Sequence, residues 1–309
     1  MNIQSLSIVV PGNNCINNCK YCVARMNKDA FLYKNQMDDN LPFYDLYFND
    51  YLKRLEYARD VGVQTVMLTG NCEPQQNRKF LKDFGIMMML MSRPFRNIEM
   101  QTTGRLIDDN YLRFLRNHVG VNIISLSISS FYDKNNCLII DNEYMNKHDN
   151  NSCDIFINLH DLCEKIKKYD FTLRVSLNMS KYIFNKEADS KYSCKSVPEI
   201  FKCCKEFNAD QVTIRVLYSS NESNNQNKWI VKNGLKNTDI DIIRNYIEQN
   251  GKLITILPYG SSQYELDGMS VVLDNDCMSK IKKGDLKYLI LRPDCKLYSQ
   301  WDSKASLVF

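Results

Sequence analysis

The chain has 309 residues, of which 44% are hydrophobic and 25% are charged, and its formal net charge is +4. This length and composition suit one large α/β domain or two ordinary ones, and they exclude a disordered or fibrous protein. Because the positive charges are scattered along the sequence, we expect no direct binding of nucleic acid.

The sequence contains no segment typical of a membrane or secreted protein. Its longest uninterrupted apolar stretch, 86–91, is far shorter than the roughly 20 residues of a transmembrane helix. The N-terminus has no basic region followed by a long apolar one, so it does not resemble a secretory signal. We therefore expect a cytoplasmic protein with no membrane partner, whose cysteines are reduced thiols or metal ligands.

Strand-like runs alternate with helical patterns through the first 220 residues. The predicted strands are 6–10, 65–70, 98–103, 121–129, 171–179 and 211–217. The predicted helices between them are 44–59, 80–91, 108–118, 155–168 and 197–207. This alternation predicts repeated βα units around a parallel sheet.

Four of the predicted strands carry polar side chains on one face. In the strand 171–179, for example, Arg174, Ser176 and Asn178 alternate with apolar residues. A parallel sheet that is covered on both sides is apolar on both faces. One polar face therefore indicates a barrel or open barrel whose interior is a wet, ligand-holding cavity.

The rest of the chain has a weaker pattern. The segments 132–151 and 219–227 are polar or of low complexity and are predicted to be surface loops. Strand-like pieces follow at 253–257, 269–273 and 288–292. We divide the chain into a core of residues 1–220 and a C-terminal extension of residues 221–309, which is expected to close the barrel and contribute to the substrate site.

Three cysteines stand directly after the first predicted strand. Cys15, Cys19 and Cys22 are separated by three and then two residues, and thiolates are ligands of zinc and of iron–sulfur clusters. A zinc site needs four ligands, but no second Cys-x-x-Cys or paired histidines follow. The pattern favours an iron–sulfur cluster in which three irons are held by the protein and one is left open.

This Cys-x3-Cys-x2-Cys motif, with Tyr21 before its third cysteine, resembles the motif of the radical S-adenosylmethionine (SAM) superfamily. The segment 70–74 resembles the glycine-rich turn of that family that ends in Glu-Pro, although Asn71 and Cys72 stand where its second glycine is usual. The resemblance implies an α/β fold with a partial (β/α)6 TIM-like barrel, and a [4Fe–4S] cluster bound by the three cysteines. SAM on the open iron would then give a 5′-deoxyadenosyl radical that abstracts hydrogen from a substrate.

The same resemblance implies contacts to SAM. Glu73 and the backbone of its turn would bind the SAM amine, and Tyr21 would flank the adenine. Serines of the fourth strand would touch the ribose, and the fifth strand would supply carboxylate and ribose ligands. The full set of expected SAM contacts is Tyr21, Gly70, Asn71, Glu73, Thr103, Ser127, Ser129, Arg174 and Asn178.

The C-terminal segment 288–298 resembles the queuosine lyases. This implies cleavage of the N-glycosidic bond of queuosine 5′-phosphate, which would release queuine for salvage into tRNA. Cations would hold the phosphate by charge-assisted hydrogen bonds, and Gln101 or Asp276 would meet the base. The expected substrate contacts are Gln101, Arg215, Asp276, Arg292, Lys296 and Tyr298.

Other functions stay open at this stage. A radical SAM maturase would act on a peptide or a partner enzyme, and a sensor would bind a cluster without cleaving SAM, although Glu73-Pro74 argues against the sensor. The remaining cysteines form no Cys-x-x-Cys pair, so an auxiliary cluster is less favoured than packing. The expected partners are a nucleoside or nucleotide substrate and an electron donor such as flavodoxin or ferredoxin.

Overall fold

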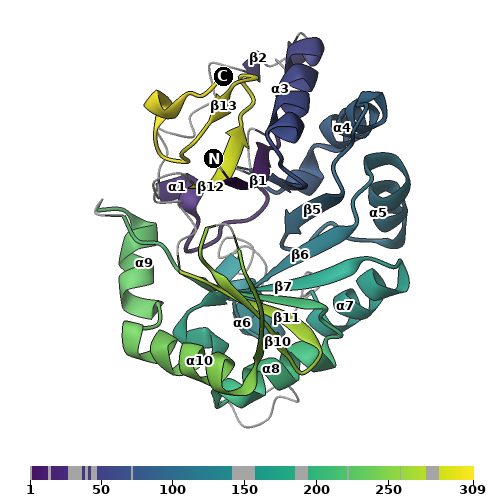
Figure 1. Ribbon diagram of the computed structural model, residues 1–309. Coiled ribbons are helices and arrows are strands. Elements are labelled where there is room, and N and C mark those ends of the chain that lie inside the picture. The colour runs from purple at the N-terminus through teal and green to yellow at the C-terminus, as the bar shows by residue number, and fades with distance from the viewer. Residues whose placement is uncertain are drawn as a thin grey trace, which may run out of the picture.

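The fold is a curved, mainly parallel sheet with helices on its outer side (Figure 1). It is seen in a computed structural model, which describes residues 2–12, 15–26, 37–38, 41–42, 47–70, 72–140, 157–184, 194–220, 223–257, 259–275 and 285–309. In this part of the chain eleven strands form one sheet, whose two outermost strands do not pair with each other. The α/β class and the open barrel are as predicted.

Six parallel strands form the centre of the sheet, and each corresponds to a predicted strand. They pair in chain order, from β1 to β8. Their bounds are β1 (Asn2–Val9), β4 (Thr65–Thr69), β5 (Asn97–Thr102), β6 (Ile123–Ile128), β7 (Thr172–Met179) and β8 (Gln211–Val216).

The C-terminal residues extend this sheet at both edges. Strand β11 (Met269–Asp274) lies parallel to β8, and β12 (Asp285–Leu291) lies parallel to β1. Outside them are β10 (Ser262–Leu266), β9 (Lys252–Ile256) and β13 (Leu297–Tyr298), and a separate hairpin pairs β2 (Met37–Asp38) with β3 (Leu41–Pro42).

Helices cover the outside of the sheet, and the five predicted ones correspond to α3, α4, α5 with η2, α7 and α8. The helices of the central units are α1 (Val23–Met26), α3 (Phe48–Asp60), η1 (Pro74–Gln76), α4 (Arg78–Leu90), α5 (Asp109–Phe114), η2 (Leu115–Val119), α6 (Asp133–Ile140), α7 (Leu159–Lys168), η3 (Lys181–Ile183) and α8 (Val197–Glu206). Three more follow: α9 (Asn225–Asn233), α10 (Asn237–Asn250) and η4 (Lys304–Ser306).

The two predicted loops were partly wrong, because each contains helical residues. Helix α6 lies inside 132–151, of which residues 141–151 are outside the described residues. Helix α9 begins inside 219–227, where the Asn224 side chain caps it by accepting a hydrogen bond from the Asn227 N–H at 2.9 Å. Asparagine is a good N-cap, so a polar run that looks like a loop also contains the start of a helix.

The two faces of the central sheet differ in chemistry, as the alternation predicts. On β7, Leu173, Val175 and Leu177 are fully buried in the apolar core formed with the helices. The alternate residues Arg174, Ser176 and Asn178 lie on the opposite, inner face. Burial of the outer face stabilises the barrel at roughly 25 cal/mol for each Å² of apolar surface removed from water.

An ion pair joins the two sides of the open barrel. Asp274 ends β11 and Lys287 lies in β12, and these strands flank the six central strands on opposite sides. Nevertheless the Lys287 Nζ lies 2.5 Å from the Asp274 Oδ1, and both side chains are less than 10% exposed. The sheet therefore curls until its two sides meet through side chains, although β11 and β12 share no backbone pairing in the described residues.

The Lys287→Met variant is expected to lose about 3–5 kcal/mol of unfolding free energy, because it removes the cation from a buried carboxylate. The measurement is urea unfolding of the anaerobic protein. In the double variant Lys287→Met/Asp274→Leu most of the loss should be recovered, whereas Lys252→Met, at an exposed position, should change little. Equal stability of Lys287→Met and the parent would contradict the role of this pair.

Candidate active site

The three motif cysteines lie on the loop that joins β1 to α1. The start of this loop is tied to β4, since the Val10 N–H donates to the Thr69 carbonyl at 2.7 Å. Its middle is tied to the end of α6, where Asn18 and Lys20 donate backbone hydrogen bonds to Ile140 and Ile139 at 2.7 and 3.0 Å. The cysteines are thus fixed beyond the carboxyl ends of the strands, where active sites of αβ barrels are found.

The environment of the thiols fits a multi-iron cluster. Burial raises the pKa of Cys15, Cys19 and Cys22, so the thiolate forms need a positive metal centre beside them. Their three sulfurs do not all lie within 4.8 Å of one another, although thiolates on one zinc ion, at about 2.3 Å each, cannot lie further apart than about 4.6 Å. A larger cluster can span them.

Glu73 lies buried between the cysteine loop and the end of β5. Its Oε2 accepts hydrogen bonds from the Thr103 N–H at 3.1 Å, the Thr103 hydroxyl at 3.0 Å and the Asn17 side-chain amide at 3.2 Å. The other oxygen, Oε1, has no hydrogen-bond partner in the described part of the chain, and neither has the Asn17 Oδ1. Burial raises the pKa of Glu73. Two buried acceptors are therefore available for a donor, which fits the SAM amine expected at Glu73.

Sequence reasoning missed Asn17. It lies inside the cysteine motif and is 3% exposed, and its amide also donates to the Thr103 hydroxyl at 3.1 Å. A small polar residue between ligand cysteines is usual in a loop, so its type alone gives no signal. The available signal was its position, because any residue between the motif cysteines must lie close to the cofactor.

Glycines allow the cysteine loop to lie against the turn after β4. A Cβ added to Gly12 would lie 2.0 Å from the Cys72 sulfur, and one added to Gly70 would lie 3.0 Å from the Val10 carbonyl oxygen. Cys72 is 7% exposed, and burial raises its pKa to about 12. The Cys72 side chain therefore occupies the space that Gly12 leaves free.

Several predicted SAM contacts come together at the ends of β6 and β7. The Tyr21 hydroxyl lies 2.9 Å from the Ser129 Oγ, and the Asn178 amide donates to the Ser127 Oγ at 3.3 Å. The Tyr21 ring also lies 6.1 Å from the ring of Trp229 in α9. Trp229 had no signal in the sequence, because α9 was not predicted.

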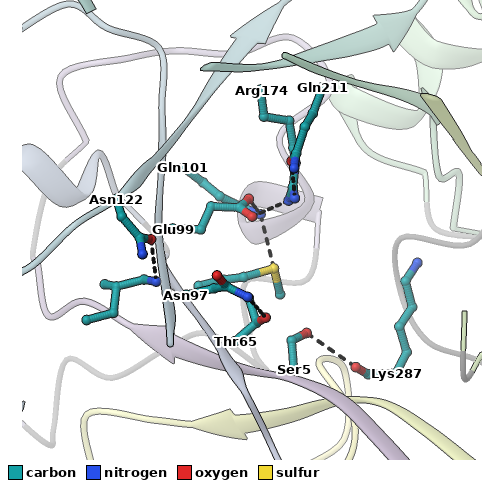
Figure 2. A network of polar contacts seen from close by, with 11 residues as sticks. Ser5, Thr65, Asn97, Glu99, Gln101, Asn122, Arg174, Gln211 and Lys287 are labelled. Atoms are coloured by element: carbon teal, nitrogen blue, oxygen red, sulfur yellow. Dashed lines mark hydrogen bonds and ion pairs between the residues drawn. The ribbon is translucent and has the colours of Figure 1, made fainter. Parts of the chain in front are cut away.

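The structure places Arg174 apart from those contacts. Arg174 is four residues before Asn178 on β7, which is about 13 Å along a strand. Its guanidinium forms an ion pair with Glu99, and its Nε donates to the Gln211 Oε1 at 2.8 Å (Figure 2). The Gln101 amide donates to the other Glu99 oxygen at 3.1 Å. Arg174 and Gln101 therefore belong to one interior network, in which the carboxylate of Glu99 neutralises the charge of Arg174.

The inner face of the sheet lines a cavity of about 410 Å³. A volume of this order is usual for a small-molecule site. The charged residues in its lining are Glu99, Arg174, Arg215, Asp274 and Lys287. It extends to the first residues of several strands, including Ile3, Thr65 and Gln211, and so reaches away from the cysteine loop.

Among the described residues, Arg215 is the one predicted substrate contact in this lining. Gln101 is not in the lining, although its hydrogen-bond partner Glu99 is. Arg292, Lys296 and Tyr298 lie near the turn between β12 and β13 and are not in the lining. The Arg292 guanidinium is buried 4.0 Å from the centre of the Tyr298 ring and donates to the carbonyls of Gln300 and Trp301, at 3.0 and 3.1 Å. Lys296 is exposed. Two more predicted residues, Asn71 and Asp276, lie outside the described residues.

Comparison with known protein families shows which family the chain belongs to. The family model described as the Radical SAM superfamily matches residues 9–185. The chain belongs to the radical SAM superfamily. As a member it uses a [4Fe–4S] cluster and SAM. The three half-buried motif cysteines fit the cluster, and the Glu73 and Asn17 oxygens that have no partner in the described residues fit SAM.

Solved structures show the same fold. Native anSMEcpe with bound AdoMet and the Cp18Cys peptide is 14% identical, with a TM-score of 0.55, and the match covers 97% of this radical SAM chain and 74% of that chain. Native anSMEcpe with bound AdoMet is 13% identical, with a TM-score of 0.54, and the match covers 96% and 74%. The search of curated proteins finds no match. In the described residues, no helix is long and apolar enough to cross a membrane.

The Gly12→Ala variant of this radical SAM enzyme is expected to bind less cluster, because its Cβ collides with the Cys72 sulfur and displaces the cysteine loop. Iron and sulfide per chain after anaerobic reconstitution measure the effect. Cys72→Ala should keep the full cluster, and the double variant Gly12→Ala/Cys72→Gly should recover it, since the colliding atoms are gone. Loss of the cluster in Cys72→Ala would instead make Cys72 a ligand.

Proposed function

We propose that this radical SAM enzyme acts on a small polar molecule with an anionic group, and that it is a lyase for queuosine 5′-phosphate. The observation that carries the proposal is the interior cavity with Arg215 in its lining. The proposal takes Cys15, Cys19 and Cys22 as the cluster ligands. When SAM is bound and one electron is supplied, these cofactors deliver a 5′-deoxyadenosyl radical, and the protein supplies binding and orientation.

Asn17 and Glu73 are proposed to hold the SAM amine together. The Glu73 Oε2 is already occupied by three donors, so the carboxylate cannot turn without losing those hydrogen bonds. This leaves Oε1 of Glu73 and Oδ1 of Asn17 as fixed acceptors for two N–H groups. Preorganised acceptors of this kind bind a charged donor strongly, because they need no reorganisation.

The Glu73→Gln variant is expected to bind SAM 10- to 100-fold more weakly, as follows from about 1.5–3 kcal/mol for a hydrogen bond to a charged group. Asn17→Ala should weaken binding in the same direction. Equilibrium dialysis of the reconstituted protein measures the affinity, and the change that SAM causes in the EPR spectrum of the reduced cluster gives a second readout. Asn250→Ala, on the exposed end of α10, is the control. Unchanged SAM affinity in Glu73→Gln would contradict the assignment.

The charges around the cavity favour an anionic substrate. Glu99 is paired with Arg174, and Asp274 is paired with Lys287. Arg215 is a third cation in this lining. A phosphate group could accept charge-assisted hydrogen bonds from its guanidinium.

Arg215 also lies at a suitable depth. It is in register with Asn178 on β7 and with Asp274 on β11. Asn178 belongs to the group of proposed SAM contacts at the ends of the strands. An anionic group held by Arg215 would therefore place the rest of a bound nucleotide beside SAM, within the cavity.

The proposed lyase activity is tested by measuring turnover of queuosine 5′-phosphate. With SAM and dithionite, queuine and 5′-deoxyadenosine are expected to appear together in mass spectrometry, and neither should form in Cys19→Ala. In Arg215→Ala the KM for queuosine 5′-phosphate should rise about tenfold or more, from the loss of a charge-assisted hydrogen bond. Activity on queuosine without phosphate should differ little between Arg215→Ala and the parent, and Arg244→Ala is a matched control. An unchanged KM in Arg215→Ala would remove the phosphate role.

A radical SAM maturase of a peptide is the second candidate. It is favoured by the similar fold of native anSMEcpe, which was solved with bound AdoMet and the Cp18Cys peptide. In the assay above, 5′-deoxyadenosine that forms without queuine would favour this candidate over the lyase. Both candidates need a one-electron donor, which we expect to be a flavodoxin or ferredoxin.

A further inference from the structure

A cationic groove lies on the outer surface of the barrel at α4, α5 and η2. It has a volume of about 540 Å³ and is lined by Arg78, Asn110, Arg113, Phe114, Asn117 and His118. These lining residues include no carboxylate. The segments 78–83 and 105–118, which form and border it, contain six Lys or Arg and three Asp. The net charge of these two segments is +3, and two of their cations, Arg78 and Arg113, line the groove.

Two residues that lie close in sequence to the groove residues contact the cysteine loop. Ile16 directly follows Cys15, and its N–H donates to the Gln76 Oε1 at 2.9 Å. The Ile16 carbonyl accepts a hydrogen bond from the Arg105 Nη1, also at 2.9 Å. Gln76 precedes Arg78 by two residues. The cationic surface therefore begins where the loop that carries the proposed cluster ligands reaches the outside of the protein.

The cations of the groove are held by neutral groups, so their charge is directed to an outside partner. The Arg78 guanidinium lies 4.4 Å from the centre of the Phe114 ring. Arg113 donates to the Tyr169 hydroxyl and the Asn110 Oδ1, both at 2.9 Å.

Two of the three acids in these segments already have partners inside the protein. Asp108 caps α5 by accepting from the Tyr111 N–H at 2.6 Å, and Asp83 lies 3.2 Å from the Lys79 Nζ. Asp109 is the third, in the first turn of α5.

The edge of this surface also has an apolar residue. Leu106 is 39% exposed next to Arg105. Protein interfaces combine apolar residues with charged ones. Because opposite charge raises the association rate and orients the partner, this surface fits an acidic protein that must meet the cluster loop briefly.

We propose that the groove with Arg78 and Arg113 is the docking site of a small acidic electron-transfer protein that reduces the cluster. The inference rests on the proposed cluster ligands and is independent of the substrate. The donor loses one electron and the cluster gains it, with no other co-reactant. The electron is the one that the cleavage of SAM consumes.

The test compares a protein reductant with a chemical one. The parent and the variant Arg78→Glu/Arg113→Glu are mixed with a reduced bacterial flavodoxin, and in a second arm with a reduced ferredoxin. Cluster reduction is followed by visible absorbance and by EPR, with no substrate present. The variant is expected to be reduced at least about tenfold more slowly by the protein donor at low salt, and the parent should slow with added salt. Reduction by dithionite should be equal in both.

The control Lys168→Glu/Lys205→Glu makes the same charge change at exposed positions of α7 and α8, and it should be reduced at the parent rate. If the groove variant keeps the parent rate with both protein donors, or if the control slows equally, the proposal is overturned. If a groove variant instead loses affinity for an RNA oligonucleotide while its reduction is unchanged, the surface binds nucleic acid and the proposal is likewise overturned.

A milder variant is used if the double Glu variant does not fold. If Arg78→Glu/Arg113→Glu fails to incorporate iron, the same rates are measured for Arg78→Gln/Arg113→Gln with a full cluster. The protein donor is expected to reduce this variant about threefold more slowly than the parent. Failure of the cluster assignment itself is distinguishable, because the parent would then bind no iron and dithionite would produce no EPR signal.

Discussion

The buried carboxylate of Glu73 is the constraint on which the active site depends. An ionised carboxylate away from water is costly unless several donors surround it. Asn17 from the cysteine loop and Thr103 from the end of β5 supply those donors on one oxygen. The same hydrogen bonds therefore fix the loop, the turn and the strand relative to one another. They also leave the second oxygen without a partner in the described residues. The hydrogen bonds to Oε2 therefore both stabilise the site and orient Oε1 to accept a hydrogen bond from a ligand.

Buried charges in the interior of the barrel also have partners at other positions. Its inner face is polar, and four of the five charged residues in the described cavity lining form two ion pairs, Arg174 with Glu99 and Lys287 with Asp274. The Lys287–Asp274 pair connects β12 and β11, which lie on opposite sides of the six central strands, so it also holds the curvature of the sheet. A ligand must bind among these charged residues without separating either ion pair. This restricts its chemistry more than the volume of the cavity does.

The sequence predicted the features that depend on local pattern. The alternation on β7 located the inner and outer faces, and the spacing of Cys15, Cys19 and Cys22 indicated the cofactor. It could not predict that Arg174 meets Glu99, because these residues are 75 positions apart and their pairing follows from strand order and register. Helix α10 was missed as well. The placement of β12 beside β1 at the opposite edge from β11 is a property of the whole sheet, so no local pattern contains it.

The proposed donor surface and the substrate cavity lie on different sides of the cysteine loop. The loop meets the outer surface at Ile16, through Gln76 and Arg105, whereas the cavity runs along the inner face toward the first residues of the strands. If both proposals hold, an electron would arrive from the outer surface while the substrate binds on the inner face of the sheet. A reactive radical is useful only where water and other side reactions are excluded. Separate routes for the donor and the substrate satisfy that requirement, since docking of the donor would not have to open the cavity.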